Sequence, residues 1–282
     1  MQKILVPNDF SDNAMKAALY ATEIAKKNGA TVFLLHAIEP VADSIRQPFP
    51  LHEKYLEEIA NRRMKELDAT RTAVANTYPE LKIEAELAKG TVTTSILDFA
   101  ESNQIDLIVM GTKGATDLKE IFMGSVAAGT IGRTIVPVLA IPNEYAMEEP
   151  DAILFATNHF EENKYLLNKI VDVAKLFSTT IHVAVFVDTD NAEASEYIHN
   201  TRQLNHYMAF LKKTFPDLSF KSELLEGKEF EETIEKYNDK NEVDIIALIT
   251  YPKSFWERLM KKSVTKKMAF HSKIPVLAIP AK

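Results

Sequence analysis

The segment that decides the fold is residues 106–133, DLIVMGTKGATDLKEIFMGSVAAGTIGR. Its apolar opening, residues 107–110, is typical of a buried strand. Glycines follow in the pattern G-x2-G-x9-G-S, which comprises Gly111, Gly114, Gly124 and Ser125. The chain of 282 residues has only eight glycines, and five of them lie in this segment. Such clustering at a strand-to-helix junction indicates backbone that adopts positive φ or closely approaches a ligand.

The residues after the third glycine predict a helix from Val126 to Ile135, with Ser125 as its N-cap. The first amides of a helix have no intrahelical acceptor and carry the positive end of the helix dipole, so they bind anions without side-chain charge. The Ser125 hydroxyl is a further donor to a phosphate oxygen. We therefore interpret this segment as a phosphate cradle; the alternative is an ordinary loop with tight turns.

The second half of the chain repeats the first. The hexapeptide PVLAIP occurs at 137–142 and again at 275–280, an offset of 138. The same offset aligns Asp106 with Asp244, and two further blocks align in the same order at offsets of 137 and 149. We therefore predict a tandem duplication with two domains, at residues 1–145 and 150–282.

Each half alternates apolar strand-like runs with helical runs. Strands are expected at 3–7, 31–38, 83–88, 107–111 and 136–141, and again near 152–156, 181–187, 219–225, 244–249 and 275–279. In the first half, helices are expected over 11–28, 56–74 and 93–102. Strands rich in Val, Ile and Leu that alternate with helices predict a parallel sheet covered on both faces. The expected fold class is α/β, with two tandem open five-stranded parallel sheets.

Composition excludes several classes of protein. The chain is 46% hydrophobic and 26% charged, which is typical of a globular protein with filled cores. It has no cysteine, and no apolar run approaches the roughly 20 residues of a membrane span. A net charge of −7 argues against a nucleic-acid partner. The histidines show no metal-ligand spacing, and the chain opens on a strand without a targeting pattern, so we expect no metal site and a cytoplasmic location.

Together these features resemble the universal stress protein family in its tandem form, over essentially the whole chain. The resemblance is carried by the opening ILVPNDFS at 4–11, the glycine signature and the closing PVLAIP. It implies an open α/β domain of the adenine nucleotide alpha hydrolase-like, Rossmann-like kind. Single domains of this family pair through their last strands, so 137–142 and 275–280 are expected to form a pseudo-dimer within one chain, which can form a homodimer in turn.

The resemblance also implies an adenine nucleotide site in the first domain. Asp9 would contact the adenosine, and the backbone around Ala37 would face the adenine. ATP, ADP or AMP is the implied ligand, and Mg²⁺ would arrive on its phosphates because no carboxylate cage is visible. The implied contacts, from the base to the phosphates, are Pro7, Asn8, Asp9, Ala37, Met110, Gly111, Gly114, Gly124, Ser125 and Val126.

The second half has lost this signature. At the offset of 138, the three signature glycines are replaced by Ile249, Pro252 and Lys262. Proline removes an N–H donor, and lysine adds a Cβ and a long side chain. At the offset of 149, Asn158 replaces Asp9. We therefore predict a degenerate second site and one nucleotide per chain.

Two residues near the predicted site have a structural interpretation as well. Asp9 is a candidate cap for the helix that follows it, although Ser11 or Asp12 would also serve. His36, on the second predicted strand, is interpreted as a core histidine with satisfied hydrogen bonds rather than as a catalyst.

Three classes of function follow. The first is an ATP-binding stress or regulatory protein, in which the ligand stabilises one conformation or assembly and the protein partner is unidentified. The second is a slow ATP hydrolase or phosphoryl-transfer enzyme. The chain has neither the Walker A pattern G-x4-G-K-[ST] nor the S-G-G-x-D-S pattern of ATP pyrophosphatases, which disfavours efficient catalysis, and no catalytic residue is assigned. The third is a scaffold that uses no nucleotide.

Overall fold

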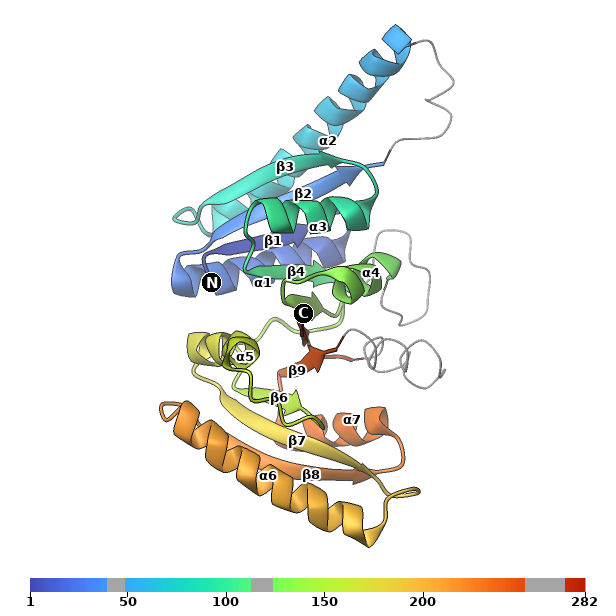
Figure 1. Cartoon of the computed structure of the whole chain (residues 1–282). Coiled ribbons are helices and arrows are strands. Elements are labelled where there is room, and N and C mark those ends of the chain that lie inside the picture. Colours follow the sequence, from blue (N-terminus) through green and yellow to red (C-terminus); the bar gives the residue numbers. More distant parts are fainter. Residues whose placement is uncertain (40–48, 113–123, 252–271, 282) are drawn as a thin grey trace. The chain divides into compact units, whose positions relative to one another are not determined.

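The computed structural model describes residues 1–39, 49–112, 124–251 and 272–281, which divide between two compact units, Met1–Asn143 and Glu144–Lys282 (Figure 1). The first unit contains β1 (Lys3–Pro7), α1 (Asp12–Asn28), β2 (Thr31–Ile38), α2 (Phe49–Thr77), β3 (Ile83–Lys89), α3 (Val92–Ser102), β4 (Leu107–Gly111), α4 (Ser125–Arg133) and β5 (Val138–Ile141). The second contains β6 (Ala152–Ala156), α5 (Lys164–Phe177), β7 (Thr180–Asp188), α6 (Ala194–Thr214), β8 (Phe220–Gly227), α7 (Phe230–Asn241), β9 (Ile245–Thr250) and β10 (Val276–Pro280).

Each unit is built on five parallel strands, which confirms the expected fold class. The order in the first unit is β3-β2-β1-β4-β5, and in the second it is β10-β9-β6-β7-β8. In the first unit the chain starts in the middle of the sheet, adds β2 and β3 on one side of β1, and then crosses to β4 and β5 on the other. The point where the order reverses, between β1 and β4, is where open α/β sheets bind ligands.

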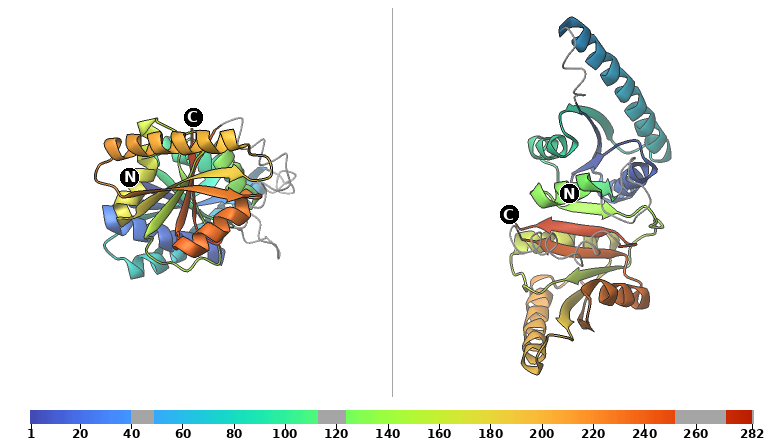
Figure 2. Two further views of the ribbon diagram at one scale, coloured as in Figure 1. Left: turned by 90° about the horizontal axis from the view of Figure 1, so that it is seen from below. Right: turned by 90° about the vertical axis from the view of Figure 1, so that its right-hand side faces the viewer.

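Helices cover both faces of the first sheet. α1 packs beside α2, and α3 packs beside α4 on the opposite face (Figure 1). Residues Ile4, Leu5 and Val6 of β1 are therefore all fully buried, whichever face they point to. The first turns of α2 extend beyond β2 and β3 (Figures 1 and 2). None of the helices in the described part of the chain is both long and apolar enough to cross a membrane.

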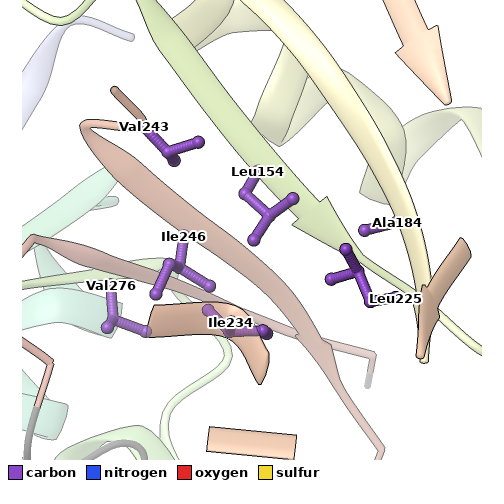
Figure 3. Packing of buried hydrophobic residues seen from close by; sticks show 7 residues of the cluster. All are labelled: Leu154, Ala184, Leu225, Ile234, Val243, Ile246 and Val276. Carbon is purple, nitrogen blue, oxygen red and sulfur yellow. The ribbon is translucent and has the colours of Figure 1, made fainter. Parts of the chain in front are cut away.

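Strand and helix in the second unit meet in a compact apolar cluster (Figure 3). Ile234 of α7 is 1% exposed and packs with buried side chains of the strands and with Val243, which precedes β9. The full cluster consists of Leu154, Ala184, Leu225, Ile234, Val243, Ile246 and Val276. The strands contribute side chains to this cluster because helices cover the second sheet, as they cover the first.

The ends of two helices in the first unit determine the loops around the predicted site. α1 begins after Ser11, whose hydroxyl accepts from the Ala14 amide at 3.1 Å, and it ends at Gly29 with φ 70°. The end of α1 agrees with the range expected from the sequence, whereas its start is one residue later, and Ser11 is the one of the three candidate caps that serves. The prediction for α4 was wrong at both ends: the helix begins one residue earlier, at Ser125 with Gly124 as its N-cap, and ends at Arg133 rather than Ile135. Gly124 has an extended backbone, and its amide donates to the Thr112 carbonyl at 2.6 Å. Gly124 therefore precedes the helix instead of forming part of it.

A pair of aspartates that the two halves share performs the same structural task in each. Asp106 Oδ2 accepts from the amides of Gln2 and Lys3 at 2.6 and 3.1 Å, which ties the start of β1 to the start of β4. Asp244 Oδ2 accepts in the same way from the amides of Asp151 and Ala152, at 2.7 and 3.0 Å, at the start of β6. Both halves thus keep an aspartate that accepts hydrogen bonds from the first backbone amides of a central strand.

Candidate functional site: a cavity at the switch point of the first unit

A cavity of about 370 Å³ lies at the carboxyl ends of the strands in the first unit, at the switch point between β1 and β4. This volume falls within the range of small-molecule sites, about 300–1,000 Å³. The cavity is lined by Pro7, Asn8, Asp9, Ala14, Leu35, His36, Ala37, Glu39, Val92, Ile96, Met110, Gly111, Thr112, Gly124, Ser125, Val126 and Ala127.

Nine of the ten residues that the sequence nominates for ligand binding line this one cavity. They come from the turn after β1, the end of β2, the end of β4 and the start of α4, which the parallel sheet brings to the same edge. The tenth, Gly114, lies outside the described residues, together with Lys113 and the rest of the loop to Met123. The structure therefore gathers the predicted residues, and their role in binding stays a prediction.

The start of α4 forms one end of the cavity. Ser125, Val126 and Ala127 make up the first helical turn, and Gly124 provides no side-chain cap for their amides. Amides of a first turn lack intrahelical acceptors, and the helix dipole places partial positive charge at this end. This end of the cavity is therefore suited to an anionic group.

Gly111 is required at the end of β4 because α1 passes close to it. A Cβ at this position would lie 2.5 Å from Nδ2 of Asn13, a residue that is 4% exposed. Such a distance is far below van der Waals contact, so any larger residue would force the buried Asn13 side chain to move. Gly111 thus has a packing role in addition to lining the cavity.

The walls include apolar residues that the sequence did not nominate. Leu35, Val92 and Ile96 line the cavity together with Met110. Val92 and Ile96 belong to α3, which no motif connects to the site, so only the packing of α3 across the sheet reveals them. Glu39 links this wall to β2, because its Oε1 accepts from the Val92 amide at 3.2 Å. An apolar wall beside an end suited to an anionic group is an arrangement that could take a flat organic group carrying phosphates.

The turn after β1 shows that Asp9 is not itself the cap of α1, and its contact with a ligand stays a prediction. Ser11 is the cap of α1, and Asp9 supports it, since Asp9 Oδ1 accepts from the Ser11 amide at 3.1 Å and from the Ser11 hydroxyl at 2.6 Å. Asp9 also lines the cavity. The two roles are compatible, because the bonds to Ser11 hold the carboxylate in a fixed place at the edge of the cavity.

His36 has the hydrogen-bonded ring nitrogen that the sequence suggested, but it is half-buried and lines the cavity rather than lying in the core. Its Nδ1 lies 2.8 Å from the Asn8 carbonyl oxygen. Burial is the main cause that lowers the pKa of His36 below its ordinary value of 6.5; Arg63 lowers it further, whereas the Asn8 contact and the carboxylates of Glu66 and Asp9 oppose the shift. The ring is therefore neutral at pH 7.

The equivalent place in the second unit is arranged differently. Phe186 stands at the position of Ala37 and packs edge-on against Phe230, with ring centroids 5.3 Å apart. Asn158, at the position of Asp9, accepts from the Phe186 amide at 3.4 Å. Aromatic side chains thus gather where the first unit has a small residue. The replacements Pro252 and Lys262 lie outside the described residues.

Sheet order, two-sided helix cover and a cavity at the switch point define this protein as a tandem, doubly wound α/β protein with a ligand-type cavity in its first unit. The model of the universal stress protein family matches residues 1–142 and again 150–280, and the chain belongs to this family. The chain is 33% identical over 140 residues to a universal stress protein of Methanocaldococcus jannaschii, which aligns half of this chain with 81% of the relative.

Two further comparisons agree. A universal stress protein of Thermus aquaticus is 33% identical over 138 residues, which cover 49% of this chain and 96% of the relative. The crystal structure of a universal stress protein from Archaeoglobus fulgidus superposes over 99% of this chain and 96% of its own with a TM-score of 0.68 and 18% identity, which supports the fold.

Within the described residues, no group of three or more His, Asp or Glu side chains is placed to hold a metal ion. Asp9 and Glu39 are the carboxylates that line the cavity, and each accepts a hydrogen bond from a neighbouring backbone amide.

Proposed function

We propose that the first unit binds an adenine nucleotide, ATP in the first instance, and that the protein is a nucleotide-dependent regulatory member of its family. The observation that carries this proposal is the convergence of the α4 amides and an apolar slot on one cavity at the switch point. Phosphates would lie against Ser125 and Val126, and the base would lie in the slot near Ala37. Mg²⁺ would be carried by the phosphates.

Bound nucleotide acts here as a conformational ligand. It shifts the protein toward a state only to the extent that it binds that state more tightly. The carboxylates of the cavity wall accept hydrogen bonds from backbone amides and thereby stabilise the wall. This role suits a binding site better than a catalytic site in which a carboxylate activates water. We extend the proposal to the assembly: the two tandem domains replace a dimer of single domains.

Titration of ATP into protein stripped of nucleotide tests the proposal, alongside the nucleotide content of freshly purified protein. We expect about one adenine nucleotide per chain. The informative variant is Ala37→Phe, which copies Phe186 of the second unit into the first. It should lower ATP affinity at least about tenfold, because an aromatic ring would enter the slot.

The reciprocal variant, Phe186→Ala, is the matched control and should leave ATP affinity unchanged. If stripped wild-type protein binds none of ATP, ADP, AMP and cyclic AMP, the proposed function is wrong and the scaffold interpretation remains. Two nucleotides per chain would contradict the degenerate second site. Continuous phosphate release over many turnovers would replace the regulatory interpretation with the enzymatic one.

A further inference from the structure

The turn that carries Asn8 and Asp9 into the cavity is held in an unusual conformation. Phe10 has φ 65°, a left-handed value that costs a non-glycine residue about 1–2 kcal/mol. The Asn8 side-chain oxygen accepts from the Phe10 amide at 2.8 Å, and Asp9 accepts from Ser11 as described above. Strain of this kind persists only where surrounding contacts enforce it, and such positions cluster at ligand sites.

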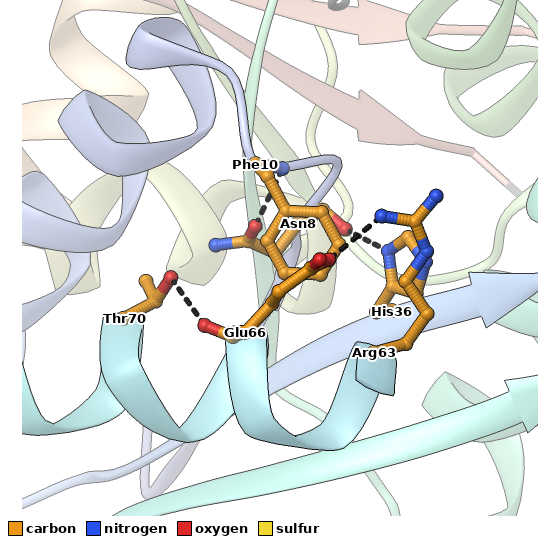
Figure 4. Close-up of polar contacts among 6 residues, drawn as sticks. All are labelled: Asn8, Phe10, His36, Arg63, Glu66 and Thr70. Carbon is orange, nitrogen blue, oxygen red and sulfur yellow. Dashed lines mark hydrogen bonds and ion pairs between the residues drawn. The ribbon is translucent and has the colours of Figure 1, made fainter. Parts of the chain in front are cut away.

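A single side chain, His36, contacts both ends of this turn (Figure 4). Because a carbonyl oxygen only accepts, the 2.8 Å contact with Asn8 requires the proton of His36 to be on Nδ1. The same ring lies against Phe10, with centroids 4.5 Å apart and an interplanar angle of 40°. His36 therefore fixes the first carbonyl of the turn and the ring of its strained residue together.

The outer side of the turn is held by α2. The Arg63 guanidinium lies over the Phe10 ring at 5.5 Å from the centroid and forms an ion pair with Glu66 at 2.7 Å. The Phe10 ring thus has His36 of β2 and Arg63 of α2 as neighbours (Figure 4). With contacts from two elements, the turn has little freedom to relax toward an unstrained conformation.

The second unit provides an internal comparison. The position of His36 is occupied there by Val185, which has no donor for the carbonyl of the turn. The turn after β6 takes a different path: Phe160 (φ 47°), one residue later than the equivalent of Phe10, is the left-handed residue. Asn158 bonds to the strand amide of Phe186 instead of to its own turn. The second unit, which has no histidine at the position of His36, thus also has a different turn and an aromatic side chain in place of Ala37.

We propose that His36 is a positioning residue for the ligand: its Nδ1–H holds the Asn8 carbonyl and thereby places Asn8 and Asp9 at the cavity. This inference rests on the proposed function, since it concerns the same site. A histidine that served only to fill the core would affect the stability of the first unit and leave ligand affinity untouched.

Two substitutions separate these roles. The side-chain amide nitrogen of asparagine occupies nearly the place of Nδ1, whereas that of glutamine occupies nearly the place of Nε2. His36→Asn should therefore bind ATP within about threefold of wild type, and His36→Gln should bind about tenfold more weakly, the loss of about one hydrogen bond to the turn. Both variants remove the ring, so the loss of stacking on Phe10 is common to them.

His182→Asn is the matched control outside the cavity. His182 is a buried strand histidine of the second unit, so this variant should lower stability without changing ATP affinity. Thermal unfolding of all variants shows whether they are folded, and the imidazole ¹⁵N shifts of the wild type without nucleotide should show the Nδ1–H tautomer of His36.

The outcomes distinguish the two proposals. If stripped wild type binds no adenine nucleotide, the proposed function fails, and this inference with it. If wild type binds and His36→Gln binds equally well, or if His36→Asn and His36→Gln are equally weak, the positioning role fails while the proposed function stands. An Nε2–H tautomer would overturn it as well. The positioning role is established if His36→Asn retains its affinity for ATP and His36→Gln loses it tenfold.

Discussion

At the scale of single residues, the internal repeat separates residues that the fold needs from residues that the proposed ligand site needs. Asp106 and Asp244 are identical in the two halves because each accepts two backbone amides at the start of a central strand. Asp9 and Ala37 line the cavity of the first unit, and they differ in the second, where Asn158 and Phe186 stand. The aspartates at the strand starts have therefore been kept, while Asp9 and Ala37 at the cavity have changed.

Asp106→Ala should lower the free energy of unfolding of the first unit by about 1–3 kcal/mol, because two backbone donors lose a charged acceptor. Asp244→Ala should have a similar effect on the second unit, which makes the two variants controls for each other. Hydrogen exchange resolved by unit is the measurement. A loss of protection spread equally over both units by either variant would contradict a local role.

Acidification should destabilise the second unit through His182. Burial, with a smaller contribution from Lys221, lowers the pKa of His182 below its ordinary value of 6.5, and Nδ1 contacts the Tyr237 hydroxyl at 3.1 Å. The unfolded chain therefore takes up the proton first. The contribution of His182 to the free energy of unfolding is fully present above pH 6.5. It is lost as the pH falls from there toward the lower pKa of His182 in the folded state.

Urea denaturation at pH 7.5 and at pH 5.5 measures this effect. His182→Asn should be less stable than wild type at pH 7.5 and should show a smaller loss between the two values, because it has no group to protonate. An unchanged pH dependence in this variant would assign the loss to other groups.

At the scale of elements, helix ends determine both the stability of the first unit and the chemistry of its cavity. Gly29 ends α1 with φ 70°, and a Cβ there would meet no atom within 4 Å. The need for glycine at this position is therefore purely conformational. The start of α4 differs, since its first-turn amides lie at the cavity without a side-chain cap.

Gly29→Ala should lower the free energy of unfolding by about 1–2 kcal/mol, the cost of a left-handed conformation for a residue with a Cβ. Gly29→Asn should cost less, because asparagine tolerates this conformation better. Chemical denaturation of the two variants checks the prediction. Equal losses would indicate steric crowding instead.

Ser125→Pro is the sharpest probe of the α4 amides. Proline is well accepted at the first position of a helix, and the extended conformation of Gly124, φ −58° and ψ 154°, is the one that a following proline favours. The variant should keep its stability but bind ATP at least about tenfold more weakly, since one N–H donor to the phosphates is gone. Ser125→Ala, which removes only the hydroxyl, is the control and should lose less affinity. Equal affinity of Ser125→Pro and wild type would exclude this amide from the site.

At the scale of the whole molecule, two units with one fold carry different sites. The family model matches both units, and each has five parallel strands. The cavity of the first unit, with Ala37 in its wall, contrasts with the aromatic pair Phe186 and Phe230 in the second. A ligand that binds the first unit alone stabilises that unit directly.

ATP at 100 times its dissociation constant should stabilise the first unit by about 2.7 kcal/mol. Hydrogen exchange should slow in residues 1–143 and change less in residues 144–282. The same experiment with Ala37→Phe should show less slowing at this ATP concentration, because a tenfold weaker affinity reduces the stabilisation to about 1.4 kcal/mol. Equal protection of both units would indicate either a second site or tight coupling between them, and the stoichiometry of binding distinguishes these two.

The sequence alone determined the fold class, the duplication and the approximate places of the strands, but the helix expected over 56–74 was too short, since α2 spans Phe49–Thr77. Local signals are sufficient for these: Ser11 and Gly29 terminate α1 by their own capping chemistry, and runs such as residues 107–110 are apolar on both faces of a strand. The start of α4 was misplaced by one residue because the amide of Gly124 bonds to Thr112, a contact that no local pattern encodes.

Only the tertiary structure decided how the cavity is enclosed. Val92 and Ile96 reach it because α3 packs across the sheet, and Glu39 reaches the start of that helix from the end of β2. The bond from His36 to Asn8 likewise joins residues 28 apart in sequence. The glycine motif can nominate residues for the proposed phosphate end because they lie close together along the chain. The remaining walls depend on packing between distant segments, which a motif does not record.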